Sequence, residues 1–178
     1  MKRMNLQLFA DSGVVGRYQH ADYIDVTGGS EEPQYELMGT GFTQINSSPS
    51  AQTTSKRYVN QKSETQSIGS YAWTAPLEFD LIRSEKAVEF IADIGENEKT
   101  GVEAETMYVQ VFLEKPVAEK QNTFEAKQRR VAVEISEFSD NEGEIQGSGN
   151  LLAKTDWVNG EFNTQTKTFT EESEVTGG

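Results

Sequence analysis

The feature that most constrains this fold is a strand-like alternation of apolar and polar residues. In residues 77–81, Leu-Glu-Phe-Asp-Leu, apolar and acidic side chains alternate at every position, which is typical of a strand with one buried face. After Gly101 the pattern continues, because Thr106–Glu114 is rich in Val, Tyr and Phe and ends before Pro116. The alternation therefore predicts a mainly β domain.

Shorter strands are expected before residue 77. Tyr35–Met38 forms a brief apolar run that ends at Gly39-Thr40-Gly41. Tyr23–Val26 is an apolar island in a segment rich in Gly, Asp, Glu and Ser. The island is interpreted as either a short strand or a docking arm.

Three further features are expected in the second half of the chain. Apolar residues occupy even positions in 124–126 and odd positions in 131–135, so we expect a bulge or bend near Arg129-Arg130. The glycines of the alternating segment 145–154 indicate close backbone approach or strong curvature. Asn159-Gly160 is the strongest hairpin-turn signal in the chain.

One helix is predicted, over residues 85–94. Ser84 is the expected N-cap, and Gly95 is the expected stop. The apolar face of the helix has the spacing i, i+3, i+4 and i+7 and consists of Ala87, Phe90, Ile91 and Ile94. A helix of this length is marginal alone, so we expect it to pack on a sheet.

The expected architecture is an antiparallel β-sandwich or half-barrel with this helix covering one sheet face. Residues 1–33 are interpreted as an N-terminal arm, 34–170 as one β domain and 171–178 as a tail. Residues 43–70 form a long polar stretch inside the domain. Long loops are usually functional or disordered. The composition of this stretch fits an arm that orders against a partner and a flexible loop equally well.

Composition excludes several kinds of chemistry. The chain of 178 residues has no Cys and one His, His20, which removes disulfides, thiolate metal sites and most catalytic triads. We therefore expect no enzyme activity, no cofactor and no metal. The acidic residues Glu137, Asp140, Glu142 and Glu144 could bind Ca²⁺ but lack the EF-hand pattern, so a solvated acidic turn is the better interpretation.

The formal net charge is −13. This balance argues against wrapping nucleic acid, which depends on clustered Lys and Arg. It favours a protein that stays soluble when crowded or that avoids a polyanion. The start of the chain has an apolar run that is short and interrupted, so we expect no targeting segment, no membrane anchor and synthesis in the cytoplasm.

Aromatic residues supply an alternative function. Tyr71, Trp73 and Trp157 flank expected strands, and exposed rings could form a sugar-binding platform. Core packing or a subunit interface is the other use. A carbohydrate-binding or receptor-binding module of a virion therefore remains the rival hypothesis.

Taken in order, several stretches resemble the major tail protein, or tail tube protein, of long-tailed bacteriophages. They cover about residues 35–170 and are Glu36–Thr43, Gln52, Arg57–Asn60, Gly69–Pro76, Leu77–Gly95, Gly160–Phe162 and Lys167–Thr170. None is a sharp motif; the resemblance is carried by their order.

The resemblance implies a structural subunit of the virion tail, made in the host bacterium. Subunits of this kind close into hexameric rings that stack into a tube, and DNA crosses the lumen without specific binding during ejection. Implied partners are further copies of the chain, a tape measure protein and tail terminator or tip proteins. A closed ring would carry 6 × −13 = −78 formal charges.

Two groups of residues are the candidates for this role. The candidate lumen-facing acids are Glu78, Asp80 and Glu134. The candidate contacts between subunits or rings are Phe42, Asn46, Pro49, Gln52, Tyr58, Tyr71, Trp73 and Trp157.

Overall fold

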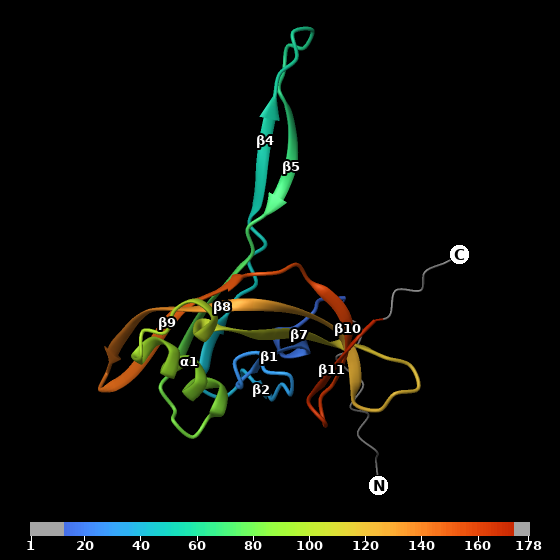
Figure 1. Ribbon diagram of the computed structural model, residues 1–178. Helices are drawn as coiled ribbons and strands as arrows, with labels where there is room; N and C mark the ends of the chain where they lie inside the picture. The colour runs from blue at the N-terminus through green and yellow to red at the C-terminus, as the bar shows by residue number, and fades with distance from the viewer. Residues whose placement is uncertain (1–12, 173–178) are drawn as a thin grey trace.

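The computed structural model describes residues 13–172 and shows a mainly β fold with a curved half-barrel sheet (Figure 1). All strand pairs in this sheet are antiparallel. The strands of the described region are β1 (His20–Asp25), β2 (Tyr35–Leu37), β3 (Phe42–Ile45), β4 (Ala51–Lys56), β5 (Thr65–Tyr71), β6 (Thr74–Asp80), β7 (Glu105–Pro116), β8 (Thr123–Asn141), β9 (Glu144–Ala153), β10 (Val158–Asn163) and β11 (Thr168–Glu171). The expected β architecture is confirmed.

The main sheet follows the order β2-β1-β7-β8-β9-β6-β3. β8 organises it, because this strand of 19 residues pairs with β7 on one edge and with β9 and then β10 on the other. β11 extends the sheet beyond β10. β2 and β3 are the ends of the sheet path, so the half-barrel keeps open edges.

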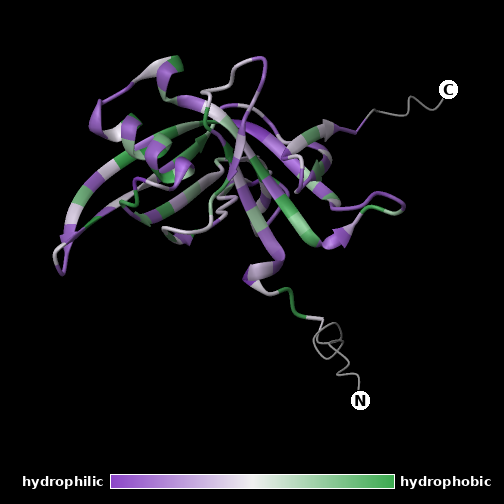
Figure 2. Ribbon diagram, turned by 90° about the horizontal axis from the view of Figure 1, so that it is seen from below, coloured by the Kyte–Doolittle hydropathy of each residue, from purple (hydrophilic) through white to green (hydrophobic). Residues whose placement is uncertain are grey.

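Two apolar clusters hold the sheet. The larger contains Trp73, Leu77, Phe79 and Tyr108 together with one face of the helix, and the smaller surrounds Phe162. Figure 2 shows hydrophobic and hydrophilic residues alternating along the strands. The strand pattern of the sequence is therefore the pattern of burial.

β8 contributes to both clusters, and this explains its switch of apolar parity. Ala126 packs in the smaller cluster, whereas Val131 and Val133 pack in the larger one. The pairing of Arg129 and Arg130 with β7 is regular, and the shift in register relative to β9 lies between Ile135 and Glu137. The bulge expected near Arg129-Arg130 is therefore wrong, because the two core clusters lie on opposite faces of an unbroken strand.

The helix α1 (Lys86–Glu96) packs on β8 and begins and ends later than predicted. Glu85, not Ser84, is the N-cap, and it makes no side-chain capping hydrogen bond. Gly95 lies inside the last turn, where an added Cβ would be 2.7 Å from the Cβ of Ile135. Gly95 therefore permits close helix–sheet contact and does not stop the helix.

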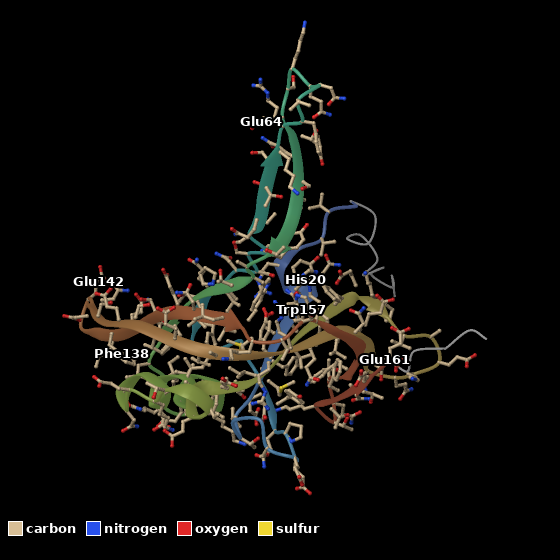
Figure 3. The ribbon with its side chains drawn as sticks, turned by 45° about the horizontal axis from the view of Figure 1, so that its top comes forward. His20, Glu64, Phe138, Glu142, Trp157 and Glu161 are labelled. Atoms are coloured by element: carbon tan, nitrogen blue, oxygen red, sulfur yellow. The ribbon has the colours of Figure 1, made fainter. Side chains whose placement is uncertain are left out.

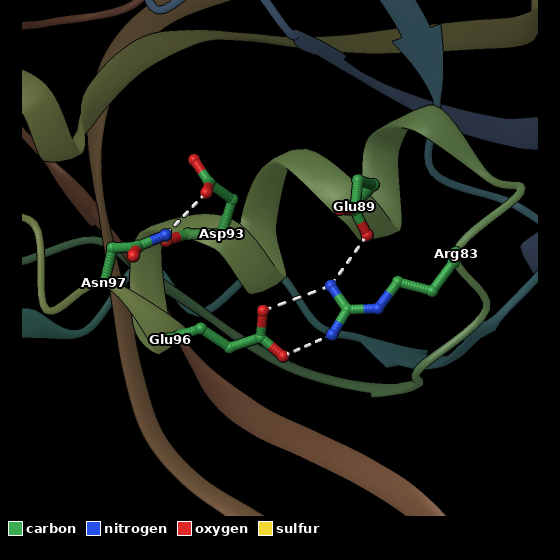
Figure 4. Close-up of polar contacts among 5 residues, drawn as sticks. All are labelled: Arg83, Glu89, Asp93, Glu96 and Asn97. Atoms are coloured by element: carbon green, nitrogen blue, oxygen red, sulfur yellow. Dashed lines mark hydrogen bonds and ion pairs between the residues drawn. The ribbon is translucent and has the colours of Figure 1, made fainter.

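An arginine joins both ends of α1 on its outer side. Arg83 donates to Glu89 Oε2 at 2.9 Å and to Glu96 Oε1 at 2.6 Å (Figure 4). In the last turn, Asn97 Nδ2 donates to Asp93 Oδ1 at 2.7 Å. Because these contacts are exposed to solvent, they contribute less to the stability of the fold than the buried apolar face of the helix does.

The hairpin turn expected at Asn159-Gly160 is wrong. Both residues lie within β10, and Gly160 pairs with Ala126 on one side and Glu171 on the other. A Cβ on Gly160 would lie 2.3 Å from the carbonyl oxygen of Thr170. The glycine is required for this close packing, and the chain turns at residues 164–167.

Residues 20–25 of the expected N-terminal arm form β1, between β2 and β7, so the strand interpretation of this segment is confirmed. Residues 1–12 of that arm and residues 173–178 of the expected tail lie outside the described residues.

Candidate assembly surfaces

The candidate lumen-facing acids lie together on one face of the sheet. Glu78 and Asp80 come from β6, and Glu134 comes from β8. Asn150 Nδ2 donates to Glu134 Oε2, and Gln146 Nε2 donates to Asp80 Oδ1, each at 2.9 Å. β9 lies between β6 and β8 and supplies both amides, so the three strands form one polar acidic face.

The polar stretch after residue 43 is a projecting β-hairpin. Residues 43–45 belong to β3, and β4 and β5 form a separate two-stranded sheet that extends away from the half-barrel (Figure 1). Every residue from 51 to 72 is exposed. An isolated hairpin of this kind is marginally stable in water. Because both of its faces are exposed, both can bind a partner.

The candidate contact residues divide into two groups. The exposed ones lie on or next to the hairpin and are Asn46, Pro49, Gln52, Tyr58 and Tyr71. Phe42 is partly buried and packs against Phe79, with ring centroids 5.9 Å apart. Trp73 is 5% exposed, and its Nε1 donates to Ser47 Oγ at 2.8 Å. Trp73 is therefore a core residue that supports the base of the hairpin.

Trp157 lies in the connection between β9 and β10, near the centre of the molecule (Figure 3), and two cations lie over its ring. Its ring is 4.3 Å from Lys127 Nζ and 4.3 Å from Arg129 Cζ. Lys127 also lies over Phe112, and Arg129 lies over Trp73. These residues form a cationic–aromatic patch, and the sugar platform expected from Trp73 or Trp157 is not free for stacking.

Burial lowers the pKa of the Lys127 ammonium, and the neighbouring charge of Arg129 lowers it further. Burial also lowers the pKa of the Arg129 guanidinium. Sequence reasoning missed this patch. The available signal was Arg129 itself, which shares the apolar parity of Val131 and Val133.

His20 does not form a catalytic arrangement within the described residues. Its Nε2 lies 3.2 Å from Glu114 Oε1, and its ring packs edge-on against Phe112. The adjoining cleft, of about 490 Å³, also contains Arg17 and Asp22. Asp22 binds Arg17 at 2.5 Å and accepts a hydrogen bond from the buried Tyr108 hydroxyl, so both of its oxygens have partners.

The acidic residues at the β8–β9 turn are exposed. Asp140 Oδ1 accepts a hydrogen bond from the backbone N–H of Gly143 at 2.8 Å, which fits the solvated turn. Among residues 13–172, no group of three or more His, Asp or Glu side chains is arranged to hold a metal ion. In the same region no helix is long and apolar enough to cross a membrane.

Comparison of the sequence with protein-family models and with curated proteins finds no match. Comparison of the structure with solved structures finds matches. A chain from the "tail of empty GTA particle", refined with C6 symmetry, matches with a TM-score of 0.55 and 12% identity, over 88% of this chain and 99% of that one. This chain shares its fold with that tail chain.

A second solved structure supports the same likeness. A chain of the 6-fold symmetrised anti-feeding prophage baseplate matches with a TM-score of 0.50 and 9% identity, over 83% of this chain and 96% of that one. Both chains are matched over nearly their full length, so the shared part is a whole domain fold. The expected resemblance to phage tail proteins is confirmed at the level of the fold.

Proposed function

We propose that this chain is a non-enzymatic structural subunit of a phage-type tail tube in the virion. Six copies close into a ring, and rings stack into a tube through which DNA passes. The observation that carries the proposal is the fully exposed β4–β5 hairpin on a half-barrel with open edges. The fold likeness to a tail of C6 symmetry supports it.

The open sheet favours assembly. Unpaired strand edges are a liability in a soluble protein, and ring closure by a repeated head-to-tail contact removes it. The hairpin projects away from the half-barrel (Figure 1), and in the proposed tube it contacts a copy of the neighbouring ring. A hairpin that lacks a core of its own gains one when it packs on another copy.

The acidic face suits the wall of a DNA channel. Glu78, Asp80 and Glu134 would repel phosphate and keep DNA from adhering. Tape measure and terminator proteins are the further partners that a tube of this kind requires.

Microscopy tests the proposal directly. Negative-stain images of concentrated purified protein are expected to show six-fold rings or tubes. A protein that stays monomeric at every concentration would overturn the proposal.

A hairpin variant sharpens the test. Replacing residues 51–72 with a short Gly-Ser linker keeps Ser47 and Ser48, which bond to Trp73 and Thr74 at the hairpin base. The variant is expected to fold and to form no stacked tubes. Exposed Glu31 and Glu32 lie in a loop away from the hairpin, so their double Gln variant is the control and should assemble as the wild type does. Normal tubes without the hairpin would refute its role in stacking.

A further inference from the structure

The cationic–aromatic patch has charges without partners. Lys127 and Arg129 form no ion pair with any carboxylate among residues 13–172, and the Arg129 side chain makes no hydrogen bond there. Arg129 is only 6% exposed, and its Nε and Nη1 are buried. Asp22 and Asp156 attract these charges from beyond ion-pair distance. Two neighbouring, partly desolvated cations therefore lack a carboxylate in contact.

The opposite arrangement is found at the β8–β9 turn. Asp140, Glu142 and Glu144 form an acidic tip, and none of them pairs with a cation of the described region. Ile145, next to the tip, is 53% exposed. The tip thus offers carboxylates beside an uncovered aliphatic side chain, and the patch offers cations beside aromatic rings.

The tip and the patch cannot meet within one copy. Arg129 and Asp140 lie on the same continuous strand, β8, and a separation of 11 residues corresponds to roughly 35 Å along a strand. In Figure 3, Glu142 lies at one end of the molecule and Trp157 near its centre. Two complementary but different surfaces on one chain are what a head-to-tail contact needs, and contacts of this type close into rings.

We propose that the acidic tip of one copy binds the cationic–aromatic patch of the next copy around the ring. This inference rests on the proposed function and deepens it, because it assigns residues to one part of the lateral contact. The carboxylates would pair with Lys127, beside the buried Arg129, and Ile145 would pack beside Trp157. Lys127 would then gain the carboxylate that it lacks, and the added negative charge would also stabilise the neighbouring Arg129.

Charge reversal tests the contact. The tip variant Glu142→Lys with Glu144→Lys is expected to weaken ring formation by about tenfold or more, measured by light scattering after size exclusion over a concentration series. Lys127→Glu should have the same effect. The chain carrying all three changes should recover most of the affinity, because the charges again match across the contact.

Two controls keep the result interpretable. Glu31→Lys with Glu32→Lys makes the same change in net charge at exposed loop positions and should leave assembly unchanged. Lys127→Met keeps the apolar stem over Trp157 and should weaken assembly without unfolding the subunit. This variant therefore tests the contact even if the Lys127→Glu chain does not fold.

The outcomes separate the two proposals. A wild-type protein that never forms rings overturns the proposed function. Wild-type rings together with tip variants that assemble normally overturn this inference alone. A triple variant as defective as the single-surface variants also counts against it.

Discussion

At the scale of single residues, close contact with glycine determines how the strands pack. A Cβ on Gly147 would lie 2.3 Å from Phe79 Cζ, and one on Gly149 would lie 1.9 Å from the carbonyl oxygen of Glu134. The phenyl ring and the neighbouring backbone therefore occupy the space that side chains would take. The close approach predicted from the glycine pattern of residues 145–154 is confirmed.

Gly149→Ala is expected to destabilise the subunit by about 1–3 kcal/mol, because backbone rather than a movable side chain blocks the new methyl group. The measurement is denaturant unfolding of the subunit. Gly69→Ala in β5 is the matched control, since its nearest atom lies at 3.8 Å, and it should be almost neutral. Equal stability of the two variants would contradict the packing argument.

Glu36 gives a pH-dependent prediction. The hydrogen bond from Lys167, with help from Lys86, holds the pKa of Glu36 below its ordinary value of 4.5, although partial burial acts in the opposite direction. Because the folded-state pKa is lowered, Glu36 stabilises the fold above about pH 4.5, and this contribution is lost as the pH falls through the folded value.

Glu36→Gln should therefore cost about 1 kcal/mol or less at pH 7 and less than that near pH 3. Urea midpoints at the two pH values measure the difference. Glu103→Gln, at an exposed position, is the control and should show no such trend. A Glu36→Gln effect that grows on acidification would contradict the sign.

Sequence reasoning found one surface and missed another at this scale. Glu78, Asp80 and Glu134 were selected from alternation, and a period of two places such residues on one face. The cationic–aromatic patch could not be selected in this way, because Lys127 and Arg129 meet Trp157 only after β9 and its connection fold back along β8.

At the scale of secondary-structure elements, burial decides which contacts of α1 matter. Ile91 is completely buried between the helix and the sheet, whereas Arg83 is exposed and pairs with Glu89 and Glu96. Ile91→Ala should cost about 2–5 kcal/mol. Arg83→Ala should cost much less, because its ion pairs are screened by solvent, and its effect should vanish in high salt.

Thermal unfolding of both variants at low and high salt checks this ranking. The prediction fails if Arg83→Ala proves the more damaging of the two changes.

The β4–β5 hairpin should be the least protected element of the free subunit. Its residues are exposed on both faces, so its amides should exchange rapidly with solvent in the monomer. In assembled tubes the same amides should be protected, while β7, at the sheet centre, remains protected in both states. Hydrogen exchange measured on the two forms provides the comparison, and fast exchange of the hairpin in tubes would speak against packing on another copy.

Secondary-structure elements were predicted best where the pattern of neighbouring residues alone determines which face is buried. The alternation of β6 and the apolar face of α1 follow from short-range pattern and were recovered, with boundary errors at the helix. The Asn159-Gly160 turn failed because Gly160 is needed under the ring of Phe169, from a strand that follows later in the chain. Tertiary packing therefore overrode a strong local turn signal.

At the scale of the whole molecule, charge distribution is the property to test. Changing Glu78, Asp80 and Glu134 to Lys alters the net charge from −13 to −13 + 6 = −7 per subunit. If the acidic face lines the tube, DNA added to tubes of this variant should be retained at low salt and released at high salt. Co-sedimentation of labelled DNA measures retention.

The control changes Glu31, Glu32 and Glu103 to Lys. These acids are exposed and lie in the loop between β1 and β2 or in the segment before β7, outside β6, β8 and β9, and the net charge becomes the same. Tubes of the control should retain far less DNA. Equal retention by both variants would show that total charge, and not the acidic face, governs adhesion.

β8 gives the assembled form a mechanical property. Asp140 of the acidic tip and Lys127 and Arg129 of the cationic–aromatic patch all lie on this one strand of 19 residues. In a ring closed by tip and patch, tension around the circumference would pass along the covalent backbone of β8 in each copy before crossing to the next. The peptide bonds of β8 would bear the load when such a ring is stretched outward. The non-covalent contacts between copies would then be the parts that separate first.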